Sequence, residues 1–252
     1  MAELLGTIGS NLKFDKKRKK ISIYNQKKLS TFASYRLLRT MRAGVLVLGP
    51  LLAKYGYAKV SLPGGCAIGS RPINFHLDAL KKMGAKIKIK GGYVVARAKK
   101  GLKGCKIRFP EISVGATENI LLASCFSKGK TKLNNCATEP EIQDLIIFLK
   151  KLGCKIKWSG RRNLEIEGIK KTRAATHKII FDRIEAGTYM IAALLTNGKL
   201  KIKNIDLSAM AVVLKLLRSM GSKILKRKNY VIVSGPKNLK STKIKKRLLP
   251  GR

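Results

Sequence analysis

Hydrophobic and polar residues follow a pattern that returns four times along the chain. Apolar residues spaced as on one face of a helix lead up to a glycine, and an alternation of lysine with aliphatic residues follows it. A glycine at this point supplies the left-handed residue that many helix ends require. Each occurrence therefore predicts a helix that ends and a strand that begins, with the break at Gly9, Gly84, Gly153 and Gly221.

A second recurring pattern lies between the occurrences of the first. It consists of a helix of small residues, a glycine and a lysine-rich strand. It predicts helices over 40–55, 117–127 and 188–196, which end before Gly56, Gly129 and Gly198. Both patterns return at intervals of about 70 residues, the length of one repeating unit. Each unit reads strand–helix–strand–helix–strand–strand. Because the apolar faces must pack on neighbouring units, we expect helices to face an interior and sheets to face outward.

The pattern is cut short at both ends of the sequence. Residue 1 falls inside a predicted helix, and the last unit begins near Lys178 and ends near Val233. The basic residues that follow have no apolar periodicity, which predicts a mostly disordered tail. We therefore expect a first domain over residues 1–180, a partial second domain over 181–235 and a basic tail over 236–252.

The charge of the chain is extreme. Lys and Arg number 55 against 13 Asp and Glu, a formal net charge of +42 over 252 residues. Such a charge normally indicates a nucleic acid or anionic lipid partner. Here the basic residues are spread over every predicted element, apart from clusters at 16–20 and 240–247, and no zinc-finger, recognition-helix or aromatic RNA-binding pattern is present. We interpret the charge as the codon bias of an A- and T-rich genome and keep polyanion binding as the alternative.

The cysteines and apolar runs bear on location. The five cysteines form no C-x-x-C pair, and the first residues run apolar then basic, the reverse of a secretory signal. This usage is typical of reduced thiols in a cytosol. The longest apolar run, 43–53, contains Pro50 and is shorter than the ~20 residues that span a bilayer. We expect a cytoplasmic protein without a membrane partner, a metal or another cofactor, or an obligate protein partner.

The most unusual stretch, residues 61–72, has three glycines in six positions and follows a predicted strand over 57–62. The glycines give the backbone more freedom than a packed core requires. Cys66 lies five residues before Arg71, and a thiol near fixed positive charge tends towards a reactive thiolate. Arginine can hold a phosphate or a carboxylate through two parallel hydrogen bonds. The stretch predicts a mobile loop with a reactive thiol beside an anion-binding group; the alternative is a turn with a buried cysteine.

Five stretches in strict order, 39–43, 61–72, 113–119, 139–142 and 182–188, resemble the UDP-N-acetylglucosamine 1-carboxyvinyltransferase family of bacterial peptidoglycan synthesis. The resemblance implies an α/β (α+β) enolpyruvyl-transferase fold, an inside-out barrel of repeated βαβαββ units in two domains that close over substrate. It also implies transfer of the enolpyruvyl group of phosphoenolpyruvate to the 3′-hydroxyl of UDP-N-acetylglucosamine, with release of phosphate. The related shikimate-pathway transferase shares the architecture, but its resemblance lacks the Gly-Gly-Cys loop.

The same resemblance suggests roles for individual residues. Cys66 matches the acid that protonates the enolpyruvyl methylene, can form a covalent adduct and is alkylated by fosfomycin. Arg42 and Arg71 match anion-binding arginines. The segment Arg71, Pro72, Ile73, Asn74 and Phe75 matches the loop that holds the sugar nucleotide, and Ser113, Val114 and Gly115 match its diphosphate or uridine contacts, where N–H groups before a helix suit phosphate.

Several other polar residues have a structural interpretation beside a functional one. Acids that precede a helix favour its dipole, so capping is an alternative for the acidic pair at 139 and 141. An ion pair is the alternative for the pair at 182 and 183, and both histidines are expected to be structural. The residues concerned are Glu139, Glu141, Asp182, Arg183, His76 and His177.

The match to the family pattern is incomplete. Asn74 stands where an acidic residue is usual, and Thr138 stands where an arginine usually precedes Glu-Pro-Glu. The Lys-Asn pair near the family's start and the catalytic aspartate and further arginines of its second domain have no counterpart in these 252 residues. We therefore expect the chain as given to fold partially and to turn over little or no substrate.

Overall fold

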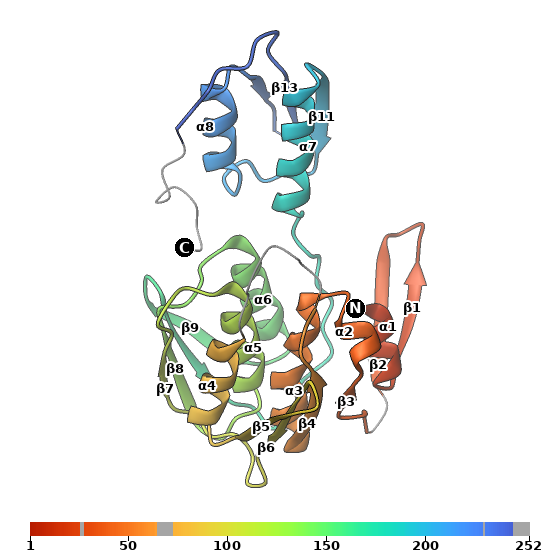
Figure 1. Cartoon of the computed structure of the whole chain (residues 1–252), viewed down its shortest axis with the longest axis vertical. Helices are drawn as coiled ribbons and strands as arrows, with labels where there is room; N and C mark the ends of the chain where they lie inside the picture. Colours follow the sequence, from red (N-terminus) through yellow and green to blue (C-terminus); the bar gives the residue numbers. More distant parts are fainter. Residues whose placement is uncertain (26–27, 65–72, 229, 244–252) are drawn as a thin grey trace. The chain divides into compact units, whose positions relative to one another are not determined.

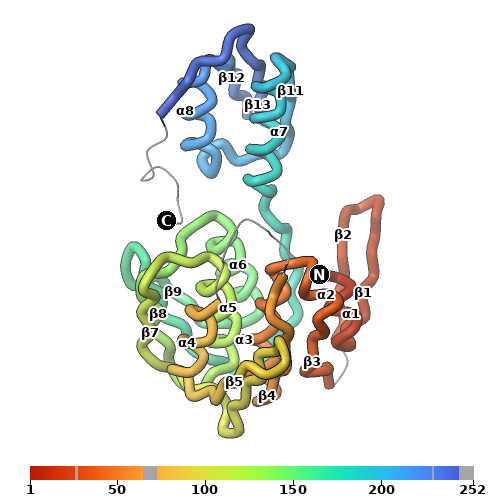
Figure 2. The backbone as a smooth tube through the Cα atoms, viewed as in Figure 1, coloured from red at the N-terminus to blue at the C-terminus, as the bar shows by residue number. Residues whose placement is uncertain are grey.

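The computed structural model describes residues 1–25, 28–64, 73–228 and 230–243. The chain divides into two compact units, traced in Figures 1 and 2. Unit 1 comprises Met1–Thr138 and Leu145–Thr176, and unit 2 comprises Glu139–Asp144 and His177–Arg252. No helix within these described ranges is long and apolar enough to cross a membrane.

Unit 1 contains two four-stranded sheets with the same topology. In each, the first two strands run parallel and the remaining neighbours run antiparallel. One sheet has the order β3(Phe32–Ala33), β4(Tyr57–Ser61), β6(Tyr93–Arg97), β5(Lys86–Lys90), and the other has the order β7(Lys106–Arg108), β8(Lys130–Asn134), β10(Asn163–Glu167), β9(Lys155–Gly160). This shared order confirms the repeating unit.

The helices of unit 1 pack around α5, which is apolar on nearly all sides. Helix α5 contacts η1, α3 and α4 and lies between α3 and α4 in Figure 1. Its residues Ile120 and Leu121 have no exposed surface. A helix buried on all sides is expected where the helices of several sequence repeats meet. The bounds are α2(Tyr35–Leu38), the 3₁₀ helix η1(Arg42–Val47), α3(Leu48–Tyr55), α4(Asn74–Lys82), α5(Val114–Ser124) and α6(Pro140–Lys151), and α6 has its first turn in unit 2.

Near the N-terminus, α1(Ala2–Thr7) leads into an antiparallel hairpin of β1(Ser10–Asp15) and β2(Lys20–Asn25). The same helix–hairpin order closes each of the other repeats. The last glycine of each helix region has a strongly positive φ: 104° at Gly9, 97° at Gly84, 106° at Gly153 and 98° at Gly221. In the last three, the following residue donates its N–H to the carbonyl five positions earlier at 3.0 Å, as in a Schellman cap. The predicted helix ends are therefore confirmed.

The second pattern is less regular than predicted. Gly56 and Gly129 are left-handed, with φ of 68° and 82°, but in the third repeat the left-handed residue is Asn197, with φ of 50°. Asparagine tolerates this conformation because its short polar side chain can bond locally. The predicted helix over 40–55 is also divided, because residues 42–47 form η1 before α3 begins.

Unit 2 holds one repeat without a described first strand. Its elements are α7(Arg183–Leu195), β11(Lys199–Lys203), α8(Ala211–Ser219), β12(Lys223–Lys226) and β13(Tyr230–Ser234), and its sheet has the order β11-β13-β12. Its core includes Met190, Leu214 and Val231. The last repeat was expected to begin near Lys178, but residues 178–182 form no helix or strand in the structure.

The described part of the basic tail is attached to unit 2. Residues 236–243 form no helix or strand, but Lys240 N donates to Met220 O at 3.2 Å and the hydroxyls of Ser219 and Thr242 lie 3.0 Å apart. These contacts attach the described part of the tail to the end of α8, and the expected disorder of the tail as a whole stays a prediction. Residues 244–252 lie outside the described residues.

The capping glycines give a direct stability test. A Cβ on Gly84 would meet no atom within 4 Å, so the cost of Gly84→Ala is backbone strain alone, about 1–2 kcal/mol. Gly6 lies inside α1 with an ordinary φ, and its Cβ would meet only Leu12 Cδ1 at 3.8 Å. We expect Gly6→Ala to be neutral or stabilising, because alanine favours helices. Urea unfolding of both variants measures the difference; equal stabilities would contradict the left-handed cap.

Candidate functional site

The predicted binding residues lie at the starts of three elements of unit 1. Arg42 opens η1, Asn74 opens α4 and Val114 opens α5. Ser113 is the N-cap of α5, and its hydroxyl accepts a hydrogen bond from Ala116 N at 3.3 Å. The first N–H groups of a helix have no partner within the helix and carry partial positive charge. Each start therefore suits a negatively charged group.

His76 lies between these starts. It is 3% exposed on the first turn of α4, and a Cβ built on Gly115 of α5 would lie 3.4 Å from its Cε1. Burial, with a smaller contribution from the positive charge of Arg42, lowers the pKa of His76 to about 4. The neutral imidazole thus lies against the start of α5 and within electrostatic range of Arg42.

The described residues on either side of the glycine-rich stretch lie at the end of α2 and at the start of α4. Gly64 N donates to Leu38 O at 3.0 Å, and a Cβ on Gly64 would lie 2.7 Å from Arg39 Cα. Only glycine allows the backbone to pass so close to α2. The stretch resumes at Ile73, the N-cap of α4. Residues 65–72, which include Cys66, Arg71 and Pro72, lie outside the described residues, so their predicted roles stay predictions.

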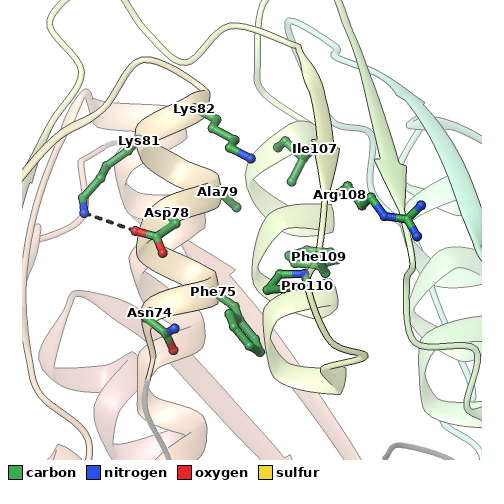
Figure 3. Close-up of a pocket in the computed structure, with 10 residues that line it drawn as sticks. All are labelled: Asn74, Phe75, Asp78, Ala79, Lys81, Lys82, Ile107, Arg108, Phe109 and Pro110. Atoms are coloured by element: carbon green, nitrogen blue, oxygen red, sulfur yellow. Dashed lines mark hydrogen bonds and ion pairs between the residues drawn. The ribbon is translucent and has the colours of Figure 1, made fainter.

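Asn74 and Phe75 also line a groove of about 580 Å³ between α4 and β7 (Figure 3). Phe109 and Pro110 face α4 from the other side, and Lys82 lies at the far end of the helix. The groove combines aromatic surface with basic groups, and Asp78 pairs with Lys81 at 3.2 Å on its rim. Such a surface suits a flat ring attached to an anion.

Three of the four described cysteines have a raised thiol pKa. Contact with Cys125 lowers the pKa of the fourth, Cys154, but this residue is only 4% exposed, so burial keeps it from reagents. Burial raises the pKa of the Cys136 thiol to about 12 and raises that of Cys105 as well. Cys125 donates its thiol proton to Leu121 O at 3.3 Å, and its pKa is raised by its contact with Cys154 and by burial. The described residues hold no group of three His, Cys, Asp or Glu side chains suited to a metal ion.

The remaining polar candidates make structural contacts within unit 2. Asp182 caps α7, since its carboxylate accepts from Ile184 N at 2.8 Å and Glu185 N at 3.0 Å. Arg183 pairs bidentately with Glu141, at 2.7 and 3.0 Å. His177 Nε2 lies 2.9 Å from the Asp144 carboxylate. These contacts support the structural interpretation of all three, although the partner of Arg183 is Glu141 rather than its neighbour Asp182.

The family model for EPSP synthase (3-phosphoshikimate 1-carboxyvinyltransferase) matches residues 1–250. The chain belongs to the EPSP synthase family. Among solved structures, NikO, an enolpyruvyl transferase from Streptomyces tendae, matches 93% of this chain and 56% of that chain with a TM-score of 0.80 at 22% identity. EPSP synthase from Acinetobacter baumannii matches 99% and 59% with a TM-score of 0.70 at 17% identity. These matches confirm the predicted enolpyruvyl-transferase fold.

Within the EPSP synthase family, curated relatives are more similar in sequence. A protein of Pelagibacter ubique named UDP-N-acetylglucosamine 1-carboxyvinyltransferase is 53% identical over 251 residues, which is 100% of this chain and 60% of that protein. A protein of the same name from Geotalea daltonii is 49% identical over 219 residues, 87% of this chain and 52% of that protein. The chain therefore spans between half and three fifths of the length of these relatives.

Asn119, next to these helix starts, has no role predicted from the sequence beyond its place at the end of the stretch 113–119. It has no exposed surface and forms hydrogen bonds with elements distant in the chain. A polar residue in an otherwise apolar helix was the available signal, because a buried amide must find partners.

Protonation of His76 should make folding depend on pH. The unfolded chain takes up a proton near pH 6.5, whereas the folded chain keeps the ring neutral down to about pH 4. This folded pKa is depressed, so stability is present above pH 6.5 and is lost as the pH falls towards 4. We expect about 2 kcal/mol of loss between pH 7 and pH 5 from this group.

Urea unfolding of the wild type and of His76→Asn at both pH values isolates the effect, because the other titrating groups are common to both proteins. The variant should lose about 2 kcal/mol less than the wild type on acidification. The same pH dependence in both proteins would mean that the histidine titrates normally.

Proposed function

We propose that this chain carries part of the site of an enzyme that transfers the enolpyruvyl group of phosphoenolpyruvate to the 3′-hydroxyl of UDP-N-acetylglucosamine and releases phosphate. The high identity to relatives named UDP-N-acetylglucosamine 1-carboxyvinyltransferase carries the proposal. The gathering of Arg42, Asn74 and the Ser113–Gly115 turn beside helix starts supports it, because both substrates are anions. The enzyme would thus catalyse the first committed step of peptidoglycan synthesis, in the cytoplasm.

The proposed reaction requires an acid and an anion site. The sugar hydroxyl gives up its proton to a base and adds to C2 of phosphoenolpyruvate while C3 takes up a proton from an acid, and phosphate then leaves as C3 gives a proton back. Cys66 is the proposed acid, and cationic groups near the substrate phosphate would stabilise the charge that develops on the neighbouring carbon. Arg42 and the proposed ligand Arg71 would hold the phosphate, with the helix starts adding N–H donors.

The sugar nucleotide is proposed to lie across the starts of α4 and α5. Ser113, Val114 and Gly115 would meet its diphosphate or uridine, and Pro72, Ile73, Asn74 and Phe75 would form the adjoining wall. The groove lined by Asn74 and Phe75 supports this placement, because it joins aromatic surface to the start of α4. Binding is the most direct readout for the chain, since it spans only part of its relatives' length.

Thiol labelling tests the proposal. UDP-N-acetylglucosamine at saturating concentration should slow iodoacetamide labelling of Cys66 at least about tenfold, because bound ligand and the anion site would cover the thiol. Cys105, which is partly exposed on the described surface, serves as an internal control and should keep its rate. Peptide mass spectrometry reports both sites in one experiment. Labelling of Cys66 that is indifferent to the nucleotide would contradict the proposal.

A further inference from the structure

The Asn119 side chain is inserted into the helix formed by η1 and α3. Its Oδ1 accepts from Gly49 N at 2.9 Å, and its Nδ2 donates to Val45 O at 3.1 Å. In an uninterrupted α-helix these two backbone groups would bond to each other, because they are four residues apart. The amide bridges the pair instead, and the chain changes from 3₁₀ to α-helix at this point. A side chain inserted into the hydrogen-bond ladder is an established cause of irregularity in a helix, most often a kink.

Gly49 is required for this insertion. A Cβ at position 49 would overlap Asn119 Oδ1 and would lie 2.6 Å from the backbone oxygen of the same residue. Since the colliding atoms include backbone of the buried helix α5, the clash cannot be relieved by a rotamer change. The close approach of α3 and α5 therefore depends on one glycine and one amide.

The same amide orients His76. Asn119 Nδ2 lies 3.0 Å from His76 Nδ1, and the roles of Gly49 N–H and Val45 C=O determine which end of the amide carries the hydrogens. His76 Nδ1 must therefore accept, so the neutral ring carries its proton on Nε2. This Nε2 lies beside the first turn of α5, 3.6 Å from the position of a Cβ on Gly115.

We propose that Asn119 and His76 are positioning residues that hold the starts of η1, α4 and α5 in one arrangement, so that Arg42 and the Ser113–Gly115 turn meet the same anionic group of the substrate. This inference rests on the proposed function for the identity of that substrate. Neither side chain touches the anion. Their hydrogen bonds join three segments that are distant in the chain, and each bond lies within two turns of a helix start.

A matched pair of variants separates positioning from simple burial. His76→Asn keeps an acceptor near the Nδ1 position, whereas His76→Leu fills the space without one. We expect His76→Leu to weaken UDP-N-acetylglucosamine binding at least about tenfold and His76→Asn to stay within about threefold, so the two affinities should differ by at least about threefold, or about 0.7 kcal/mol. Calorimetric titration of the whole chain at 15 °C measures both. Equal affinities of the two variants would overturn the inference.

A buried polar residue outside the network controls for destabilisation. Thr131 on β8 has no exposed surface, and its hydroxyl lies 3.4 Å from the hydroxyl of Ser127, away from Asn119 and His76 in the hydrogen-bond network. Thr131→Val should lower the melting temperature without changing the affinity. If His76→Leu fails to fold, the tautomer of the wild-type His76 ring still decides, because Asn119 can hold the ring as proposed only when Nδ1 accepts.

A ligand-free measurement keeps this inference separate from the proposed function. ¹⁵N NMR should show the His76 ring protonated at Nε2, and the Gly115 amide and the Arg42 Nε–Hε signal should shift in His76→Leu but not in Thr131→Val. If the wild type does not bind UDP-N-acetylglucosamine, the proposed function fails while these shifts still decide the positioning role. Unchanged Gly115 and Arg42 signals, or a ring protonated at Nδ1, would overturn it.

Discussion

The hydrogen-bonding requirement of one buried amide organises the site-bearing half of this molecule. Asn119 has no exposed surface, so each of its polar atoms needs a partner within the protein. It obtains them from Gly49, Val45 and His76, which belong to three different elements. An apolar residue at this position could fill the same space, but it would leave the Gly49 N–H and the His76 ring without this partner. The amide thus couples the packing of helices to the direction in which their first turns point.

This coupling lies in the buried core, at the first turns of the helices. Helix α5 is enclosed by α3, α4 and η1, and a helix start that is packed so tightly cannot move independently of its neighbours. The neutral state of His76 belongs to the same constraint, because a charged imidazole would be buried beside Arg42. The packing of these helix starts therefore depends on keeping one buried group uncharged.

The repeating architecture was predictable from the sequence because it is written in local signals. Gly84, Gly153 and Gly221 adopt a left-handed backbone, and lysine alternates with aliphatic residues in the strands that follow. Both features can be recognised in the sequence without any information on tertiary contacts. The assignment of Arg42, Asn74 and Ser113 to one binding site follows only from family resemblance and stays a prediction. The insertion of Asn119 and the 3₁₀ form of residues 42–47 were not predictable, because they arise from contacts across about 70 positions of the chain. The left-handed Asn197 was missed for a simpler reason, since a glycine next to it gave the more obvious signal.

The large positive charge is compatible with the apolar core because the lysines and the core residues lie on opposite faces of the sheets. In β8 and β9 the lysines point to solvent while Thr131, Leu133 and Ile156 point inward. On the outer face, Glu165 of β10 lies 3.2 Å from both Lys132 and Lys157, so one carboxylate separates two cations. Elsewhere an aromatic ring, rather than a carboxylate, interacts with the lysine: Lys201 Nζ lies 4.1 Å from the centre of the Tyr230 ring. Lysine can thus accumulate on the sheets without entering the core, and the starts of α4, α5 and η1 keep their own arrangement of charge.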